Sequence, residues 1–150
     1  MGSNGPTLVQ GELNMTQVVK KLFDGDRKLI YSFNFTIAST TAENYEIDVT
    51  DAAKCALNNK GQQAVALTIN KAWWSVNNSA TTKPLKLFYE ASADDLALTC
   101  NFADDQDWST IGGLKNPRSS GFTGSIKVNF SSVTDDDTAT LVLELIKDYS

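Results

Sequence analysis

Hydrophobic and polar residues alternate along most of the chain with the two-residue period of a β-strand. Seven stretches carry this alternation, namely residues 29–38, 45–49, 65–70, 85–90, 96–100, 126–131 and 139–146. Segments rich in Gly, Asn, Asp and Pro separate them, among them DGD at 24–26 and VNNSATTKP at 76–84, and such residues favour turns. The pattern therefore predicts seven or eight short strands.

Short strands at this density, with almost no helical pattern, are typical of a β-sandwich or a barrel. We predict an all-β fold, a single β-sandwich of jelly-roll type that covers residues 16–150. The one short helix that we expect lies near residues 50–57, in TDAAKCAL, where Thr50 or Asp51 would cap it. Residues 1–15 show no period, and we expect them to form an extended N-terminal arm that is flexible or bound to a partner.

The composition narrows the class of protein. With 150 residues, of which 41% are hydrophobic, the chain is long enough for one globular domain with its own core. Its formal net charge of -5 argues against nucleic acid as a partner, because clustered Lys and Arg bind a phosphate backbone. We expect no membrane partner either, since no apolar stretch approaches the ~20 residues of a membrane span and the N-terminus does not look like a signal peptide.

The sequence has no histidine, which removes the commonest general base, the usual nucleophile pairs and most zinc sites. A hydrolase with paired carboxylates and sugar-stacking tryptophans is the enzymatic alternative. Its carboxylates would come from Asp94, Asp95, Asp104, Asp105 and Asp107. These aspartates fall in segments that we predict to be turns, where Asp is favoured for backbone reasons. We therefore expect no enzyme, no cofactor and no bound metal.

Three consecutive aspartates, Asp135, Asp136 and Asp137, lie between the last two predicted strands. As a Ca²⁺ site they would need further oxygen ligands from elsewhere in the chain. Aspartate is also common at the tip of a hairpin, because its side chain accepts hydrogen bonds from nearby backbone N–H groups. We predict a solvated loop tip and not a metal site.

The two cysteines, Cys55 and Cys100, are expected to be free thiols, because nothing in the sequence signals secretion and disulfides are rare in a reducing compartment. Cys100 is in phase with Leu96, Leu98 and Phe102, which predicts that it is a small buried hydrophobe. A disulfide between the two cysteines is the alternative.

Two adjacent tryptophans, Trp73 and Trp74, cannot enter the same core, because successive residues of a strand point to opposite faces. The phase of Val65, Leu67 and Ile69 predicts that Trp73 points inward and Trp74 outward, unless a bulge intervenes. An outward Trp is covered by the chain itself or contacts another molecule. The interface residues that we expect are the three tryptophans and three apolar residues of the arm: Trp74, Trp73, Trp108, Leu8, Val9 and Leu13.

Six segments stand out when they are taken in order: VVKKLFDGDRKL (18–29), INKAWWSV (69–76), LKLFYEASADDLALT (85–99), IGGLKNP (111–117), GFTGSIKVNF (121–130) and TLVLELIK (140–147). In this order and spacing they resemble a family of small virion structural proteins of tailed bacteriophages. The resemblance spans residues 16–147. It departs at Ser125, where an acid is expected after Gly124, and residues 1–15 lie outside it.

The resemblance implies a capsid decoration (cement) protein, which would bind the outer face of the major capsid protein lattice and stabilise the head. Its partners would be the major capsid protein and further copies of the same chain, with a homotrimer suited to three-fold positions. Its location would be the virion, assembled in the bacterial host cytoplasm. The alternative is a tail or fibre component that acts as a receptor-binding, glycan-binding or adaptor module. The copy number in the particle distinguishes the two.

Overall fold

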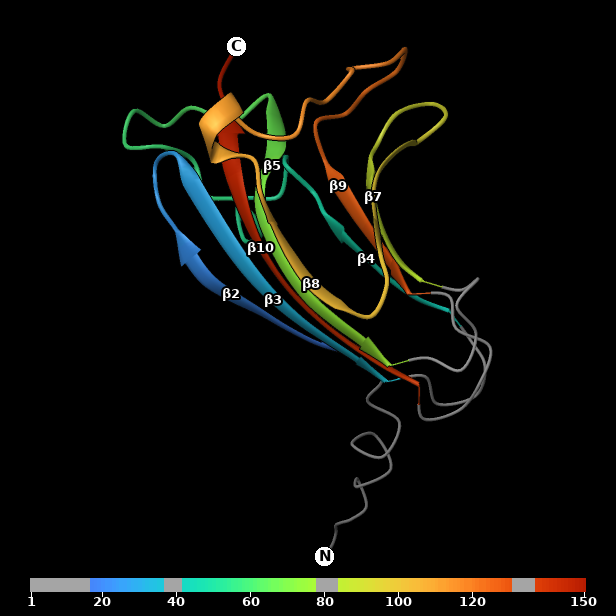
Figure 1. Ribbon diagram of the computed structural model, residues 1–150. Coiled ribbons are helices and arrows are strands. Elements are labelled where there is room, and N and C mark those ends of the chain that lie inside the picture. The colour runs from blue at the N-terminus through green and yellow to red at the C-terminus, as the bar shows by residue number, and fades with distance from the viewer. Residues whose placement is uncertain (1–16, 37–41, 78–83, 131–136) are drawn as a thin grey trace, which may run out of the picture.

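The computed structural model describes residues 17–36, 42–77, 84–130 and 137–150 (Figure 1). These ranges contain nine β-strands and one three-residue 3-10 helix. The strands are β2 (Gln17–Asp24), β3 (Lys28–Thr36), β4 (Glu43–Ile47), β5 (Ala66–Asn77), β6 (Leu85–Tyr89), β7 (Asp95–Cys100), β8 (Ala103–Asp107), β9 (Ile126–Phe130) and β10 (Thr138–Asp148), and the helix is η1 (Ser109–Ile111). The all-β prediction is therefore confirmed.

The strands form two antiparallel sheets that face each other (Figure 1). One sheet has the order β2-β3-β10-β5-β8 and the other has the order β4-β9-β6-β7. Their pairing is nested, because β3 pairs with β10, β4 with β9, β5 with β8 and β6 with β7. A long hairpin folded over in this way gives the two sheets of a jelly roll. The predicted jelly-roll sandwich is confirmed, with β2 as an additional strand beside β3.

The core lies between the two sheets and consists of the inward side chains of both. Aromatic rings connect the sheets across this core. Phe33 in β3 meets Tyr45 in β4 edge to face at 5.6 Å between ring centroids, and Phe35 meets Phe130 in β9 at 6.3 Å. Each such pair adds roughly 0.5–1.5 kcal/mol beyond the area that it buries. The alternation in the sequence thus becomes a packed interface between two sheets.

Strand β10 lies in the middle of the five-stranded sheet, between β3 and β5. Its inward residues Leu141, Leu143 and Leu145 are fully buried. Its outward residues Val142 and Ile146 are half-buried. Apolar residues on both faces are typical of a strand in the middle of a sheet, and the central position of β10 accounts for them.

The helix expected near residues 50–57 is absent, and the segment forms turns. Its backbone bonds to neighbouring strands instead of continuing a helix. The Ala56 N–H donates to the Asp24 carboxylate at the end of β2, and the Lys54 carbonyl accepts a hydrogen bond from the Tyr31 hydroxyl in β3 (2.6 Å). The helix prediction was wrong because tertiary hydrogen bonds outweigh the local preference.

The two outer strands of the five-stranded sheet, β2 and β8, do not appear among the alternating stretches. Strand β8 contains Asp104, Asp105 and Asp107, which we had expected in turns, and all five of its residues are exposed. A strand with no buried face leaves no alternation in the sequence. Charged residues are common on such edge strands because they discourage pairing with other chains.

A register shift in the pairing of β6 with β7 interrupts the alternation of β7. Leu96 is 55% exposed and Phe102, beyond the end of the strand, is 69% exposed. The expectation that these two share a buried face with Cys100 was wrong. Cys100 itself is fully buried, as predicted, and both Cys100 and Cys55 are free thiols.

Of the three consecutive aspartates, only Asp137 lies among the described residues. Asp137 directly precedes β10 and is only 8% exposed. The prediction of a solvated loop tip was therefore wrong for this residue. Asp135 and Asp136 lie outside the described residues. The N-terminal arm predicted at residues 1–15 lies outside them too.

Candidate functional site

The two adjacent tryptophans have the opposite orientation to the predicted one. Trp74 is buried at 8% exposure, and its indole Nε1 donates a hydrogen bond to the Asn101 carbonyl (3.0 Å). Trp73 is 42% exposed and therefore points away from the core. The prediction of an inward Trp73 and an outward Trp74 was wrong, and Trp73 is the tryptophan available to a partner.

A bulge in β5 causes this reversal. Along β10, Leu145 faces Ile69 and Glu144 faces Lys71, so Asn70 is an extra residue in β5. An extra residue moves every later side chain to the opposite face from the one that a strict period predicts. The Asn70 side chain is buried and its Nδ2 donates to Glu144 Oε2 (2.8 Å). The bulge thus has a buried polar contact of its own.

Trp73 lies on the outer face of the five-stranded sheet, between two other strands. Its cross-strand neighbours are Val142 in β10 and Asp105 in β8. Val142 is half-buried and Asp105 is exposed, so a large aromatic ring is bordered by an apolar residue and by a carboxylate. Of the other expected interface residues, Trp108 is half-buried against the core, and Leu8, Val9 and Leu13 lie outside the described residues.

The aspartates considered for a carboxylate hydrolase are divided between the two sheets. Asp95 begins β7 in the four-stranded sheet and Asp94 precedes it, whereas Asp104, Asp105 and Asp107 belong to β8 in the five-stranded sheet. Asp94 and Asp107 are each paired with a lysine of their own sheet. The structure therefore does not bring these five carboxylates together as one set.

A different pair of carboxyl groups, Glu46 and Glu90, lies on the outside of the four-stranded sheet. The hydrogen bond between them raises the pKa of Glu46, and burial and nearby negative charge add to this. Burial would also raise the pKa of Glu90, but hydrogen bonds from Glu46, Thr123 and Lys127 lower it. The Lys127 ammonium also pairs with Asp94 (3.1 Å). All these groups are engaged with one another, so we regard the cluster as a structural charge network.

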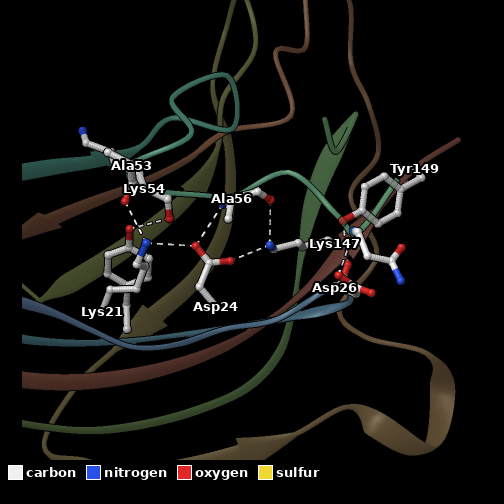
Figure 2. A network of polar contacts seen from close by, with 10 residues as sticks. Lys21, Asp24, Asp26, Ala53, Lys54, Ala56, Lys147 and Tyr149 are labelled. Atoms are coloured by element: carbon white, nitrogen blue, oxygen red, sulfur yellow. Dashed lines mark hydrogen bonds and ion pairs between the residues drawn. The ribbon is translucent and has the colours of Figure 1, made fainter. Parts of the chain in front are cut away.

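A buried ion pair connects the end of β10 with the end of β2 (Figure 2). The fully buried Lys147 ammonium donates to Asp24 Oδ1 (2.5 Å) and to the Ala56 carbonyl (2.9 Å). Asp24 Oδ2 accepts from Lys21 Nζ and from the Ala56 N–H, each at 2.9 Å. Burial alone would raise the pKa of Asp24, but the hydrogen bonds from Lys147, Lys21 and Ala56 outweigh it and lower the pKa.

This network fastens the 53–56 turn onto the five-stranded sheet. Lys21 Nζ also donates to the Ala53 carbonyl (2.8 Å), and the Tyr149 hydroxyl donates to the Asp26 carbonyl (2.6 Å). Three segments that are distant in the sequence are thereby held together: the hairpin after β2, the turn and the end of β10. Its role is to fix the backbone at this end of the sandwich.

A hollow of about 650 Å³ is lined by residues of η1, of the loop after it and of the C-terminal segment. Figure 1 shows η1 and the C-terminus at the same end of the sandwich. We call it the basic hollow, because both arginines of the sequence lie in its wall. One comes from the turn before β3 and the other from the loop after η1. Its main polar residues are Arg27, Thr68, Lys115, Asn116, Arg118 and Asp148.

Sequence reasoning missed both the buried ion pair and the basic hollow. For the ion pair a signal was present: Lys147 is in the same phase of β10 as Leu143 and Leu145, so the alternation places it on the inward face. For the hollow there was none, because Arg27 and Arg118 are brought together by the fold alone.

The chain matches no protein-family model and no curated protein. Among residues 17–36, 42–77, 84–130 and 137–150, no three Cys, Asp or Glu side chains gather closely enough to hold a metal ion. The same part of the chain contains no helix of the length and apolar character needed to cross a membrane.

Proposed function

We propose that the chain is a structural protein of a tailed bacteriophage particle, and specifically a capsid decoration protein that binds the outer face of the major capsid protein lattice. The resemblance of six segments across residues 16–147 supports this proposal. The jelly-roll fold is in keeping with it, since such sandwiches recur in viral capsid domains, although they also recur in lectins. Because one fold serves many functions, the proposal depends on a surface suited to binding a neighbour.

Trp73 is the observation that carries the proposal. Its ring is 42% exposed on a strand that is paired on both sides, with β10 and with β8. Tryptophan is enriched at binding hot spots because a large apolar ring gains much from leaving water while its N–H keeps a hydrogen bond. A rigid sheet beneath the ring lowers the entropy lost on binding. The outer face of the five-stranded sheet is therefore the surface that we assign to the capsid lattice.

A decoration protein stabilises a shell by connecting neighbouring subunits. Each copy then needs only an ordinary interface, because contacts to two or more subunits act together through a high effective concentration. A homotrimer would place three such faces around a three-fold position of the lattice. The major capsid protein and further copies of this chain are the partners that the proposal requires.

The copy number in purified particles tests the location. Quantitative mass spectrometry of the phage that carries this chain should show hundreds of copies per particle if the protein covers the shell. A dozen copies or fewer would overturn the decoration proposal and favour the tail or fibre alternative.

The binding surface is tested by returning purified protein to particles that lack it. We expect Trp73→Ala to bind such particles at least tenfold more weakly than the unchanged protein. Leu96→Ala is the matched control, since Leu96 is 55% exposed but belongs to the opposite sheet. Equal binding by Trp73→Ala and Leu96→Ala would show that the outer face of the five-stranded sheet is not the contact.

A further inference from the structure

The basic hollow contrasts with the rest of this acidic chain. The protein carries 18 acidic residues against 13 basic ones, yet Arg27, Lys115 and Arg118 all line this one hollow. Arg27 and Arg118 come from opposite parts of the sequence, so their presence in one hollow is a property of the fold. Guanidinium groups are the side chains best shaped for paired hydrogen bonds to carboxylate or phosphate oxygens.

Most of the hydrogen-bonding capacity of these cations is unused. Among the described residues, the Arg27 and Lys115 side chains form no hydrogen bond or ion pair. Arg118 donates one hydrogen bond, from Nη2 to the main-chain oxygen of Ser150, the last residue of the chain (3.0 Å), and its guanidinium lies over the Phe122 ring at 5.3 Å. Stacking of this kind orients an arginine while leaving its other N–H groups free.

The acidic groups nearby do not neutralise the hollow. Asp148 is the one carboxylate side chain in its lining, and its Oδ2 accepts a hydrogen bond from the Thr68 hydroxyl (2.5 Å). Lys147 also belongs to the lining, but its side chain is fully buried and its charge is paired with Asp24. The other three cations of the lining, Arg27, Lys115 and Arg118, outnumber the Asp148 carboxylate and the terminal carboxylate that Ser150 carries in the 150-residue chain. The hollow therefore keeps a net positive charge.

The wall that carries Lys115 and Arg118 is held in place by backbone contacts. The Leu114 N–H donates to the Ile69 carbonyl (2.7 Å). Gly113 has a φ of +105°, and a Cβ at this position would lie 2.7 Å from Thr68 Cγ2, so the loop approaches β5 more closely than any other residue type allows. The Arg118 N–H donates to Asn116 Oδ1 (2.8 Å). The cations thus project from a fixed backbone, which favours binding without rearrangement.

We propose that the basic hollow binds a small ligand that carries two or more oxyanion groups, either carboxylates or phosphates. Its volume of about 650 Å³ is within the usual range for small-molecule sites and exceeds the needs of a single oxyanion. Arg27 and Arg118 hold the oxyanions by paired hydrogen bonds, and Lys115 contributes a point charge. The inference does not depend on the proposed capsid role.

The test uses the full chain with citrate as the carboxylate probe and pyrophosphate as the phosphate probe, in isothermal titration calorimetry at low ionic strength. The unchanged protein should bind at least one probe saturably at one site per chain, and added NaCl should weaken the binding because it screens the charges. Binding of citrate alone assigns carboxylates, binding of pyrophosphate alone assigns phosphates, and binding of both assigns a general oxyanion site.

Variants locate the site. Arg27→Gln and Lys115→Gln remove side chains that have no partner among the described residues, so folding should be unaffected while affinity falls at least tenfold for Arg27→Gln and severalfold for Lys115→Gln. Lys60→Gln is the control, since it removes the same charge from an exposed lysine outside the hollow and should bind as the unchanged protein does. The proposal is overturned if neither probe binds saturably, or if Arg27→Gln binds as tightly as Lys60→Gln.

Discussion

Lys147 and Asp24 form an ion pair in which the lysine side chain is completely buried and the carboxylate is 10% exposed. Lys147 has two hydrogen-bond partners, whereas Asp24 also accepts bonds from Lys21 and from the Ala56 N–H. When Lys147 is removed, Asp24 therefore keeps a positively charged partner, whereas Lys147 keeps only a carbonyl group when Asp24 is removed.

This asymmetry predicts unequal costs for the two single substitutions. Asp24→Asn leaves a buried ammonium without a counter-charge and should lower the free energy of unfolding by about 3–5 kcal/mol. Lys147→Met should cost less, because Asp24 keeps Lys21 and the Ala56 N–H and retains some contact with water. Urea denaturation measures both, with Lys60→Met as an exposed control near zero. A larger loss for Lys147→Met than for Asp24→Asn would contradict the assignment.

The lowered pKa of Asp24 predicts a pH dependence. The ionised form is favoured in the folded state, so its stabilisation is fully present above the usual Asp pKa of 3.8 and is lost as the pH falls through the lower, folded-state pKa. The difference in unfolding free energy between the unchanged protein and Asp24→Asn should stay constant from neutral pH to about pH 5 and shrink at more acidic pH. A difference that grew on acidification would have the wrong sign.

The orientation of the two tryptophans predicts that their replacement lowers stability by unequal amounts. Trp74→Ala should cost about 3–5 kcal/mol, because it empties a core position and removes a hydrogen bond to the Asn101 carbonyl. Trp73→Ala should cost about 1 kcal/mol or less, since its ring is already in contact with water. Chemical denaturation distinguishes them, and equal losses would indicate that the bulge at Asn70 is misplaced.

Two glycines with a left-handed backbone, Gly61 and Gly124, differ in the space around them. Replacing each by alanine therefore distinguishes the cost of backbone strain from the cost of a steric clash. A Cβ on Gly124 (φ +88°) would lie 2.0 Å from the Val65 carbonyl oxygen, whereas a Cβ on Gly61 (φ +76°) meets nothing within 4 Å. Gly61→Ala should therefore cost about 1–2 kcal/mol from backbone strain alone. Gly124→Ala should cost more than about 4 kcal/mol or prevent folding. Thermal melts of the two variants check this, and similar losses would show that β5 does not approach Gly124 so closely.

The buried thiols predict slow labelling. Burial raises the pKa of Cys55, although Lys147 lowers it in part, and burial raises the pKa of Cys100 to about 12. Since the thiolate is the reactive form, both cysteines should react with Ellman's reagent far more slowly in the folded chain than in guanidinium. The unfolded, unreduced protein should titrate two thiols per chain. A value near zero would reveal a disulfide.

The sequence by itself determined the fold class and the position of most strands. Phe33 and Phe35 alternate with polar neighbours, as do Leu141, Leu143 and Leu145, and this local pattern needs no knowledge of which strands pair. The physical reason is that a strand with one buried face must repeat every two residues, wherever its partners come from in the chain.

The tertiary structure alone decided which face the residues of β5 after the bulge turn to, and which residues come together at the candidate sites. The bulge at Asn70 depends on its pairing with Glu144 in a distant strand, and it decides which tryptophan faces outward. Strand β8 has no buried face, so only its pairing with β5 makes it a strand. Arg27 and Arg118 line the same hollow because nested strand pairing brings two distant turns to one end of the sandwich. Such contacts arise from register and topology, which the local pattern of residues does not encode.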